Sequence, residues 1–207
     1  MSQSPNQFDQ RLIEMLNKMA NVGIYNAARG LSGMVGESLS VENPGVKLVP
    51  LSDIPNLLGG PEAEAVGIYL RAEGNLGGQI MLVVPYEKSL ELADMIIGLP
   101  PGTTTQLGSL ERSALAEMGN VTGTFFMNAV AEATGLSIRP SPPAVMVDMV
   151  GAVLDIVLAT AAQLSEHVMM IQATFGCAGR AVVTDFWMIP DRLTLDAIAK
   201  RERGANG

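Results

Sequence analysis

The chain has 207 residues, of which 48% are apolar but only 4% aromatic, so a core must be built mainly from aliphatic side chains and 13 methionines. The formal net charge of −8 argues against a nucleic-acid-binding protein, which needs a basic surface. We expect a cytoplasmic protein for three reasons. Cys177 is the only cysteine, residues 1–10 lack the pattern of a leader peptide, and the sequence has no long uninterrupted apolar run.

One chemical pattern occurs twice in the chain, with an offset of 99 residues. In each copy two polar residues stand four apart, an asparagine follows three residues later, and a proline follows 23 residues after the asparagine. The members are Glu14, Lys18, Asn21 and Pro44 in the first copy, and Ser113, Glu117, Asn120 and Pro143 in the second. An internal repeat of this kind indicates two equivalent structural units.

In the first half, the spacing of apolar residues predicts a long helix, a short strand, a short helix, a hairpin with a glycine-bearing loop, and a final amphipathic helix. The approximate ranges are 9–35, 46–49, 52–58, 66–72 with 79–84, and a helix from Ser89.

The second half is predicted to repeat this order. The approximate ranges are 109–133, 144–147, 149–162, 168–174 with 180–188, and a helix from Thr194. Ser109 is the expected N-cap of the long helix, and Gly135 is expected to end it.

The predicted organisation is a first repeat over 8–98, a linker over 99–107 rich in turn-forming residues, and a second repeat over 108–203. A half of about 100 residues with so few aromatic side chains would bury only a thin core alone. We therefore predict one pseudo-twofold α+β domain, in which the four hairpin strands form an antiparallel sheet with helices packed on it.

On the long helix of the second half, Ser113, Glu117 and Asn120 fall within an arc of about 60°. A polar stripe of this kind is usually only the solvated face of an amphipathic helix. Gly119 and Gly123 lie inside the same helix, where each costs about 1 kcal/mol relative to alanine. Their presence indicates either close approach by another backbone or tight packing of the helix on the sheet.

The second copy resembles the [Asp/Ser]-x3-Glu-x2-Asn-x22-Pro signature of the CheC/CheX/FliY family of chemotaxis phosphatases. The segments 117–123 and 21–32 are also similar to the corresponding helices of that family, and to its CheC members most closely. With the duplication, the resemblance extends over about residues 9–200.

This resemblance implies hydrolysis of the aspartyl phosphate of a CheY-like response regulator. The regulator would supply the Mg²⁺, so no metal or organic cofactor of the chain's own is implied. Asn120 would orient the attacking water, because a carboxamide can donate and accept hydrogen bonds at once. Glu117 would pair with a lysine of the regulator, and Ser113 and Pro143 would support the site.

The first copy departs from the signature, because Lys18 replaces the glutamate and Glu14 stands where Asp or Ser is usual. A lysine would repel the regulator's lysine, and Lys18 is well placed for an ion pair with Glu14. We interpret this site as degenerate, with Asn21 and Pro44 retained. The alternative is a different partner, whose acidic residue meets Lys18.

Asp148 lies in a stretch that resembles the part of CheC that binds the receptor deamidase CheD; alternatively, it simply caps the following helix. The second function considered is therefore a weakly catalytic or non-catalytic regulator that binds CheD or docks CheY. A flagellar switch component is a third, weaker expectation, because no extra switch domain follows residue 207. The single histidine, His167, has no second metal-ligating residue nearby and is expected at the surface.

Overall fold

The computed structural model describes residues 10–161, 167–177, 179–191 and the single positions 194, 196, 197 and 200. The elements of the first half are α1 (Gln10–Val35), β1 (Ser40–Pro50), η1 (Leu51–Asp53), α2 (Ile54–Leu57), β2 (Glu64–Gly74), β3 (Gly78–Pro85) and α3 (Tyr86–Ile97). Those of the second half are α4 (Ser109–Thr134), β4 (Ile138–Pro140), β5 (Ala144–Met149), α5 (Val150–Ala161), β6 (His167–Cys177) and β7 (Arg180–Pro190).

The strands form a single antiparallel sheet in the order β1-β6-β7-β3-β2-β4, with β5 also paired to β2. The two hairpins, β2–β3 and β6–β7, make up its centre, and β3 pairs with β7 across the middle. The outer strands are exchanged: β1 of the first half pairs with β6, and β5 of the second half pairs with β2. The mixed fold of helices and an antiparallel sheet is therefore confirmed.

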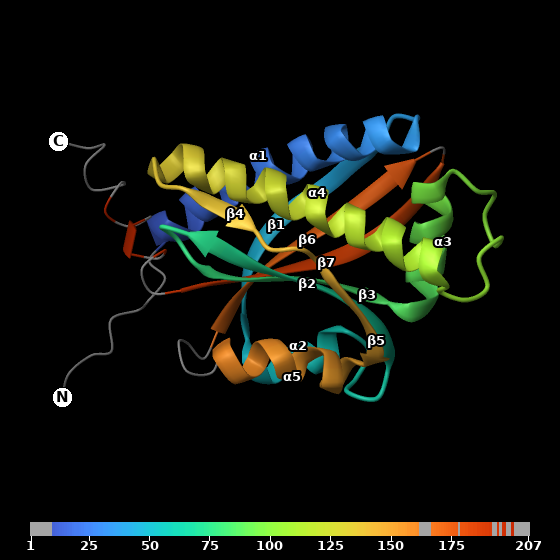
Figure 1. Cartoon of the computed structure of the whole chain (residues 1–207). Helices are drawn as coiled ribbons and strands as arrows, with labels where there is room; N and C mark the ends of the chain where they lie inside the picture. Colours follow the sequence, from blue (N-terminus) through green and yellow to red (C-terminus); the bar gives the residue numbers. More distant parts are fainter. Residues whose placement is uncertain are drawn as a thin grey trace.

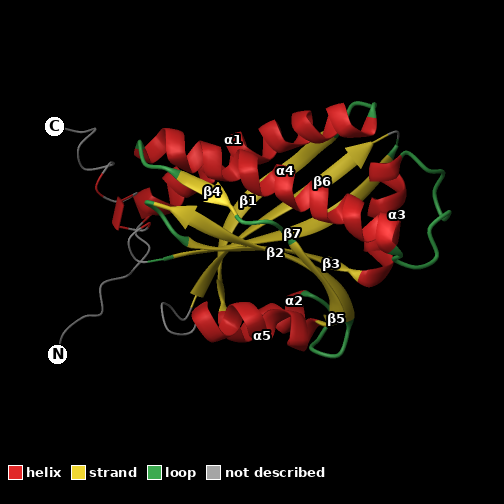
Figure 2. Cartoon of the chain, in the orientation of Figure 1, coloured by secondary structure: helices red, strands yellow, loops and turns green. Residues whose placement is uncertain are grey.

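Helices cover both faces of the sheet (Figure 1). The long α1 and α4 lie side by side on one face with α3, whereas α2 and α5 lie on the other (Figure 2). Strand β3 shows the alternation that results. Its Ile80, Leu82 and Val84 join the core under α1 and α4, and Met81 and Val83 join the smaller core beneath α5. A central strand covered on both faces is apolar throughout.

Helices α1 and α4 run in opposite directions. Gly30, late in α1, lies against Val121 in the first half of α4, and Gly23 lies against Phe126 further along α4. A Cβ on Gly23 would come within 2.7 Å of the Phe126 Cα, so only glycine allows the two backbones to approach this closely.

The segment between the halves is held by a buried carboxylate. α3 ends at Gly98, which has a φ of 77°, and no helix or strand is assigned from there to α4. Asp94 is 1% exposed and accepts hydrogen bonds from the amides of Thr103, at 3.0 Å, and Thr104, at 2.9 Å. Burial alone would raise the pKa of Asp94, but the hydrogen bonds from Thr104, Thr103 and Gly102 outweigh it and lower that pKa.

Several expected boundaries differ from the structure. Strand β1 is longer than the predicted run, and β4 was not predicted. Ser109 is the first residue of α4 rather than its cap, because Gly108 occupies the capping position without a side-chain bond. Gly135 ends α4 with a φ of 72°, as predicted. Most of the helix expected from Thr194 lies outside the described residues.

Candidate functional site

Glu117 and Asn120 share one face of α4 because they are three residues apart in a continuous helix. Glu117 is exposed and Asn120 is half-buried. Within the described part of the chain, neither side chain forms a hydrogen bond or an ion pair. A carboxylate and a carboxamide are thus presented together with their full bonding capacity available to an external molecule.

The opposite face of α4 fixes this pair to the sheet. A Cβ on Gly119 would come within 2.5 Å of Ile68 Cγ2, and one on Gly123 within 3.3 Å of Leu70 Cδ2. Both contacts are with buried side chains of β2. Of the two interpretations of these glycines, tight packing on the sheet is therefore correct. Asn120 is the direct neighbour of Gly119, so this packing fixes the position of the site.

Ser113 and Pro143 lie at the margins of the site. The Ser113 hydroxyl donates to the Ser109 carbonyl at 2.8 Å, so its hydrogen is used within the helix. Pro143 is half-buried in the short connection between β4 and β5, where no ladder hydrogen bond is needed. Both β4 and β5 contact α4, which places this connection close to the helix.

The corresponding residues of the first half lie on α1. Glu14 and Lys18 are exposed and Asn21 is half-buried. The predicted ion pair between Glu14 and Lys18 is wrong: among the described residues, neither side chain has an ionic partner. Exposed side chains of this length gain too little from pairing to be held in one geometry. Pro44 lies in β1 where the register with β6 shifts, but its side chain is outside the described part.

A groove of about 330 Å³ lies between the beginning of α1 and the end of α4, and we call it the α1–α4 groove. Its lining residues are Met15, Lys18, Met19 and Val22 from α1, and Ala129, Glu132 and Ala133 from α4. Glu132 thus faces the same groove as Lys18, from the opposite helix. Glu132 could not be identified from the sequence, because the contact between α1 and α4 joins two halves that are distant in the chain.

Asp148 is exposed near the end of β5, opposite Ala65 of β2. Its carboxylate accepts a hydrogen bond from the amide of Met149, the residue before α5, at 2.8 Å. The first amides of α5, those of Val150 and Gly151, donate instead to backbone carbonyls of the 61–63 segment. Asp148 therefore does not cap a helical N–H, and the capping interpretation is wrong.

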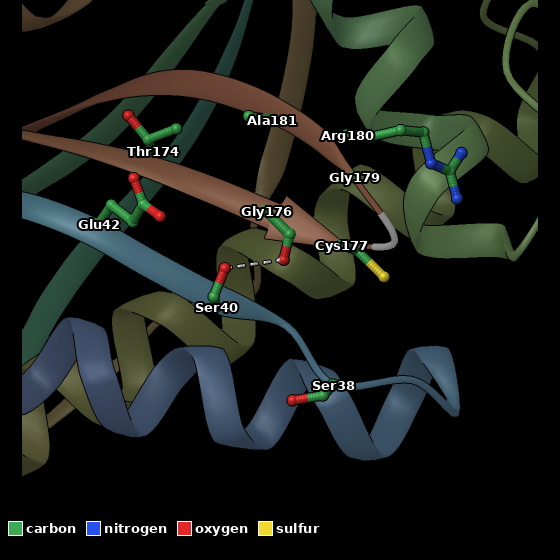
Figure 3. A pocket seen from close by; sticks show the side chains of 9 residues that line it. All are labelled: Ser38, Ser40, Glu42, Thr174, Gly176, Cys177, Gly179, Arg180 and Ala181. Carbon is green, nitrogen blue, oxygen red and sulfur yellow. Dashed lines mark hydrogen bonds between the residues drawn. The ribbon is translucent and has the colours of Figure 1, made fainter.

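A second hollow, of about 300 Å³, lies beside the turn between β6 and β7 (Figure 3). The buried Cys177 thiol there donates to the Glu37 carboxylate at 3.2 Å. Burial, and then Glu37, raise the pKa of Cys177, which disfavours the reactive thiolate. Arg180 donates to the Leu99 carbonyl at 3.0 Å. These two hydrogen bonds connect the β6–β7 hairpin to Glu37 and Leu99. Since its thiolate is disfavoured, Cys177 is not a candidate nucleophile.

The described ranges contain no cluster of three or more His, Cys, Asp or Glu residues able to hold a metal ion. None of the helices in those ranges is both long and apolar enough to cross a membrane. His167 begins β6, and its side chain lies outside the described part.

Comparison with known proteins points to one family. The sequence pattern of the CheC-like family matches residues 110–147, the segment that contains Ser113, Glu117, Asn120 and Pro143. The chain is 28% identical to the CheY-P phosphatase CheC of Bacillus subtilis over 171 residues, which cover 82% of both chains. The chain is similar to the CheC/CheX/FliY family.

Two further proteins are similar to the chain, one in sequence and one in fold. The chain is 23% identical over 135 residues to a putative CheY-P phosphatase CheC1 of Halobacterium salinarum, covering 65% of this chain and 68% of the relative. The crystal structure of FliY from Thermotoga maritima has the same fold, with a TM-score of 0.73 and 18% identity, over 94% of this chain and 96% of FliY.

Proposed function

We propose that this chain hydrolyses the aspartyl phosphate of a CheY-like response regulator, with one competent site at Glu117 and Asn120. The single observation that carries this proposal is the carboxylate–carboxamide pair on one face of α4, in which Glu117 is exposed, Asn120 is half-buried and neither has a partner among the described residues. The similarity to the Bacillus subtilis CheY-P phosphatase supports it.

Asn120 is proposed to position the attacking water in line with the phosphorus. An acyl phosphate is already activated, so catalysis requires positioning and charge stabilisation rather than a nucleophile of the enzyme. A carboxamide accepts a hydrogen bond from the water and donates one to a phosphoryl oxygen without changing its own protonation. The half-buried Asn120 is well suited to this role, since the packing of Gly119 on Ile68 fixes its backbone.

Glu117 is proposed to pair with a lysine in the regulator's active site and so dock that region against α4. The Mg²⁺ that neutralises the phosphoryl oxygens would belong to the regulator, bound by its own acidic residues. Ser113 and Pro143 would then act by shaping the helix and the adjacent connection rather than by touching the phosphate.

The first half is proposed to be a weak or inactive site, because Lys18 would repel the lysine that Glu117 attracts. Asn21 retains the carboxamide, but the position three residues before it holds Lys18 instead of a carboxylate. We attribute both sites to a duplication of one ancestral unit. The exchanged strands β1 and β5, which complete each other's hairpins, support this view.

We further propose that the protein acts in the cytoplasm, where such regulators signal, and that it binds no nucleic acid. The net charge of −8 and the unpaired, buried Cys177 are consistent with both expectations.

A second candidate function is that of a regulatory protein that binds CheD or holds CheY without rapid turnover. The observation in its favour is the exposed pair Asp148 and Met149 at the end of β5, where Met149 is 49% exposed. Because Asp148 has no capping role in α5, its exposed carboxylate is available to a partner.

The two functions separate in one experiment that follows the decay of a phosphorylated CheY-type receiver domain with Mg²⁺. Glu117→Lys installs the first-half residue in the second site and should abolish the acceleration, while circular dichroism shows an unchanged fold. Asp148→Ala is the matched surface control and should leave the decay unaffected. Acceleration that survives Glu117→Lys would refute the proposed site. No acceleration by the wild type, together with CheD binding sensitive to Asp148→Ala, would favour the regulatory function.

A further inference from the structure

Gly33 is a helical glycine that the packing of the described chain does not explain. It lies in the last turn of α1, and glycine is a poorer helix former than alanine. The other two glycines of this helix are required by α4. A Cβ on Gly23 would come within 2.7 Å of the Phe126 Cα, and one on Gly30 within 2.5 Å of the Phe125 ring. A Cβ on Gly33 has nothing within 4 Å, so no contact among the described residues requires glycine there.

The two long helices correspond to each other residue by residue. Both α1 and α4 have 26 residues, and their first and last residues are 99 positions apart. Each is followed by a glycine with a positive φ, of 77° after α1 and 72° after α4. Gly33 is therefore the counterpart of Glu132, and Lys18 is the counterpart of Glu117. Because Lys18 and Glu132 line one groove between the helices, Glu117 and Gly33 should face each other in the same way.

A contact between the helices supports this placement. A Cβ on Gly30 would come within 3.2 Å of Val121 Cγ1. The two helices run in opposite directions (Figure 1), so one turn forward along α1 to Gly33 corresponds to one turn back along α4 to Glu117. Gly33 is thus exposed beside Glu117, at the position where the first site has the exposed side chain of Glu132.

A receiver domain bound at Glu117 and Asn120 would also cover the adjacent part of α1. Packed helices lie about 8–10 Å apart, whereas a stable protein interface takes about 800 Å² from each partner. One face of α4 alone cannot supply this area, so the neighbouring turn of α1 must contribute to the contact. A side chain on that turn would lie between the two proteins.

We propose that Gly33 is a specificity-determining residue of the site on α4, because its missing side chain leaves room for the response regulator to reach Glu117 and Asn120. This inference rests on the function proposed above and extends the site from α4 to α1. At the first site Glu132 projects into the corresponding space, so the two sites differ in access as well as in charge. Side chains added at Gly33 should weaken binding of the regulator and leave the positioning of water by Asn120 unchanged.

The test measures kcat and KM for phosphate release from a phosphorylated CheY-type receiver domain with Mg²⁺. Gly33→Ala and Gly33→Leu add uncharged side chains of increasing size, and both residues are good helix formers. Asp155→Leu is the matched control, because it adds the same leucine at an exposed position of α5, on the other face of the sheet (Figure 2). Circular dichroism and urea unfolding check that every variant keeps the fold.

We expect Gly33→Leu to raise KM by about fivefold or more, since overpacking a fitted contact is unfavourable, and Gly33→Ala to raise it less. The kcat value should stay within about twofold of the wild type, because a loss confined to KM marks an interaction made on binding. Asp155→Leu should match the wild type in both constants. An unchanged KM in Gly33→Leu, or a fall in kcat at unchanged KM, would overturn this inference and leave the proposed phosphatase intact. No acceleration by the wild type would refute the proposed function and this inference with it.

Discussion

Gly23 of α1 lies directly against the backbone of Phe126 in α4, and a Cβ on Gly23 would come within 2.7 Å of the Phe126 Cα. This contact sets how closely the two site-bearing helices pack, because backbone atoms cannot move aside as the end of a flexible side chain can. The relative positions of the two candidate sites therefore depend on the close approach of α1 and α4 at Gly23.

Gly23→Ala should destabilise the protein by about 1–3 kcal/mol, the usual cost of overpacking a close-packed interior. Gly33→Ala is the matched control on the same helix, because it meets nothing within 4 Å. It should be neutral or stabilising by up to about 1 kcal/mol, since alanine is the better helix former. Urea unfolding of the three proteins measures both effects. Equal stability of Gly23→Ala and the wild type would contradict the closeness of α1 and α4.

Asp94→Asn should destabilise the protein by about 1–3 kcal/mol near neutral pH, because one amide of the linker loses its acceptor. The folded-state pKa of Asp94 is lowered below its ordinary value of 3.8. Its ionised form therefore contributes stability that is fully present well above pH 3.8 and is lost as the pH falls through the lowered pKa.

The stability difference between wild type and Asp94→Asn should accordingly shrink as the pH falls below about 4. Chemical denaturation at a series of pH values measures this trend. A difference that stays constant down to pH 2, or grows on acidification, would show that Asp94 is not held as a carboxylate.

Repair of the first site should require two changes rather than one. Lys18→Glu restores the signature residue, but the new carboxylate would face Glu132 across the α1–α4 groove. In an Asn120→Ala background, Lys18→Glu alone should give little acceleration of receiver dephosphorylation. Adding Glu132→Ala removes the repulsion and should contribute about 0.2–1 kcal/mol, up to about fivefold in rate at low substrate. Full recovery by Lys18→Glu alone would show that Glu132 has no influence.

Much of the fold follows from local sequence patterns. The helical spacing of Leu16, Met19 and Leu31 in α1, all buried, is visible without a structure, as are the glycine-bearing loops of the two hairpins. The end of α4 at Gly135 was predicted correctly because its left-handed conformation has a strong residue preference. Such features depend on a residue and its near neighbours.

Features that join distant segments could not be predicted. The exchange of β1 and β5 between the halves depends on pairings between residues more than 100 positions apart for β1 with β6, and 75 to 85 positions apart for β5 with β2. The sequence of a strand does not indicate which distant strand it pairs with. The same holds for Glu132 opposite Lys18, and for Gly23, whose packing partner is on the other long helix. The pair Glu117 and Asn120 could be proposed because its spacing lies within one helix.

The most direct test of the central claim compares Asn120→Ala with Asn21→Ala. Both remove one half-buried carboxamide from the corresponding position of a long helix, so their effects on stability should be similar. The measurement is phosphate release from a phosphorylated CheY-type receiver domain with Mg²⁺ present. We predict that Asn120→Ala falls to the receiver's own rate of hydrolysis, whereas Asn21→Ala retains the wild-type rate. Equal loss in both variants, or no acceleration by the wild type on any receiver tried, would contradict a single competent site on α4.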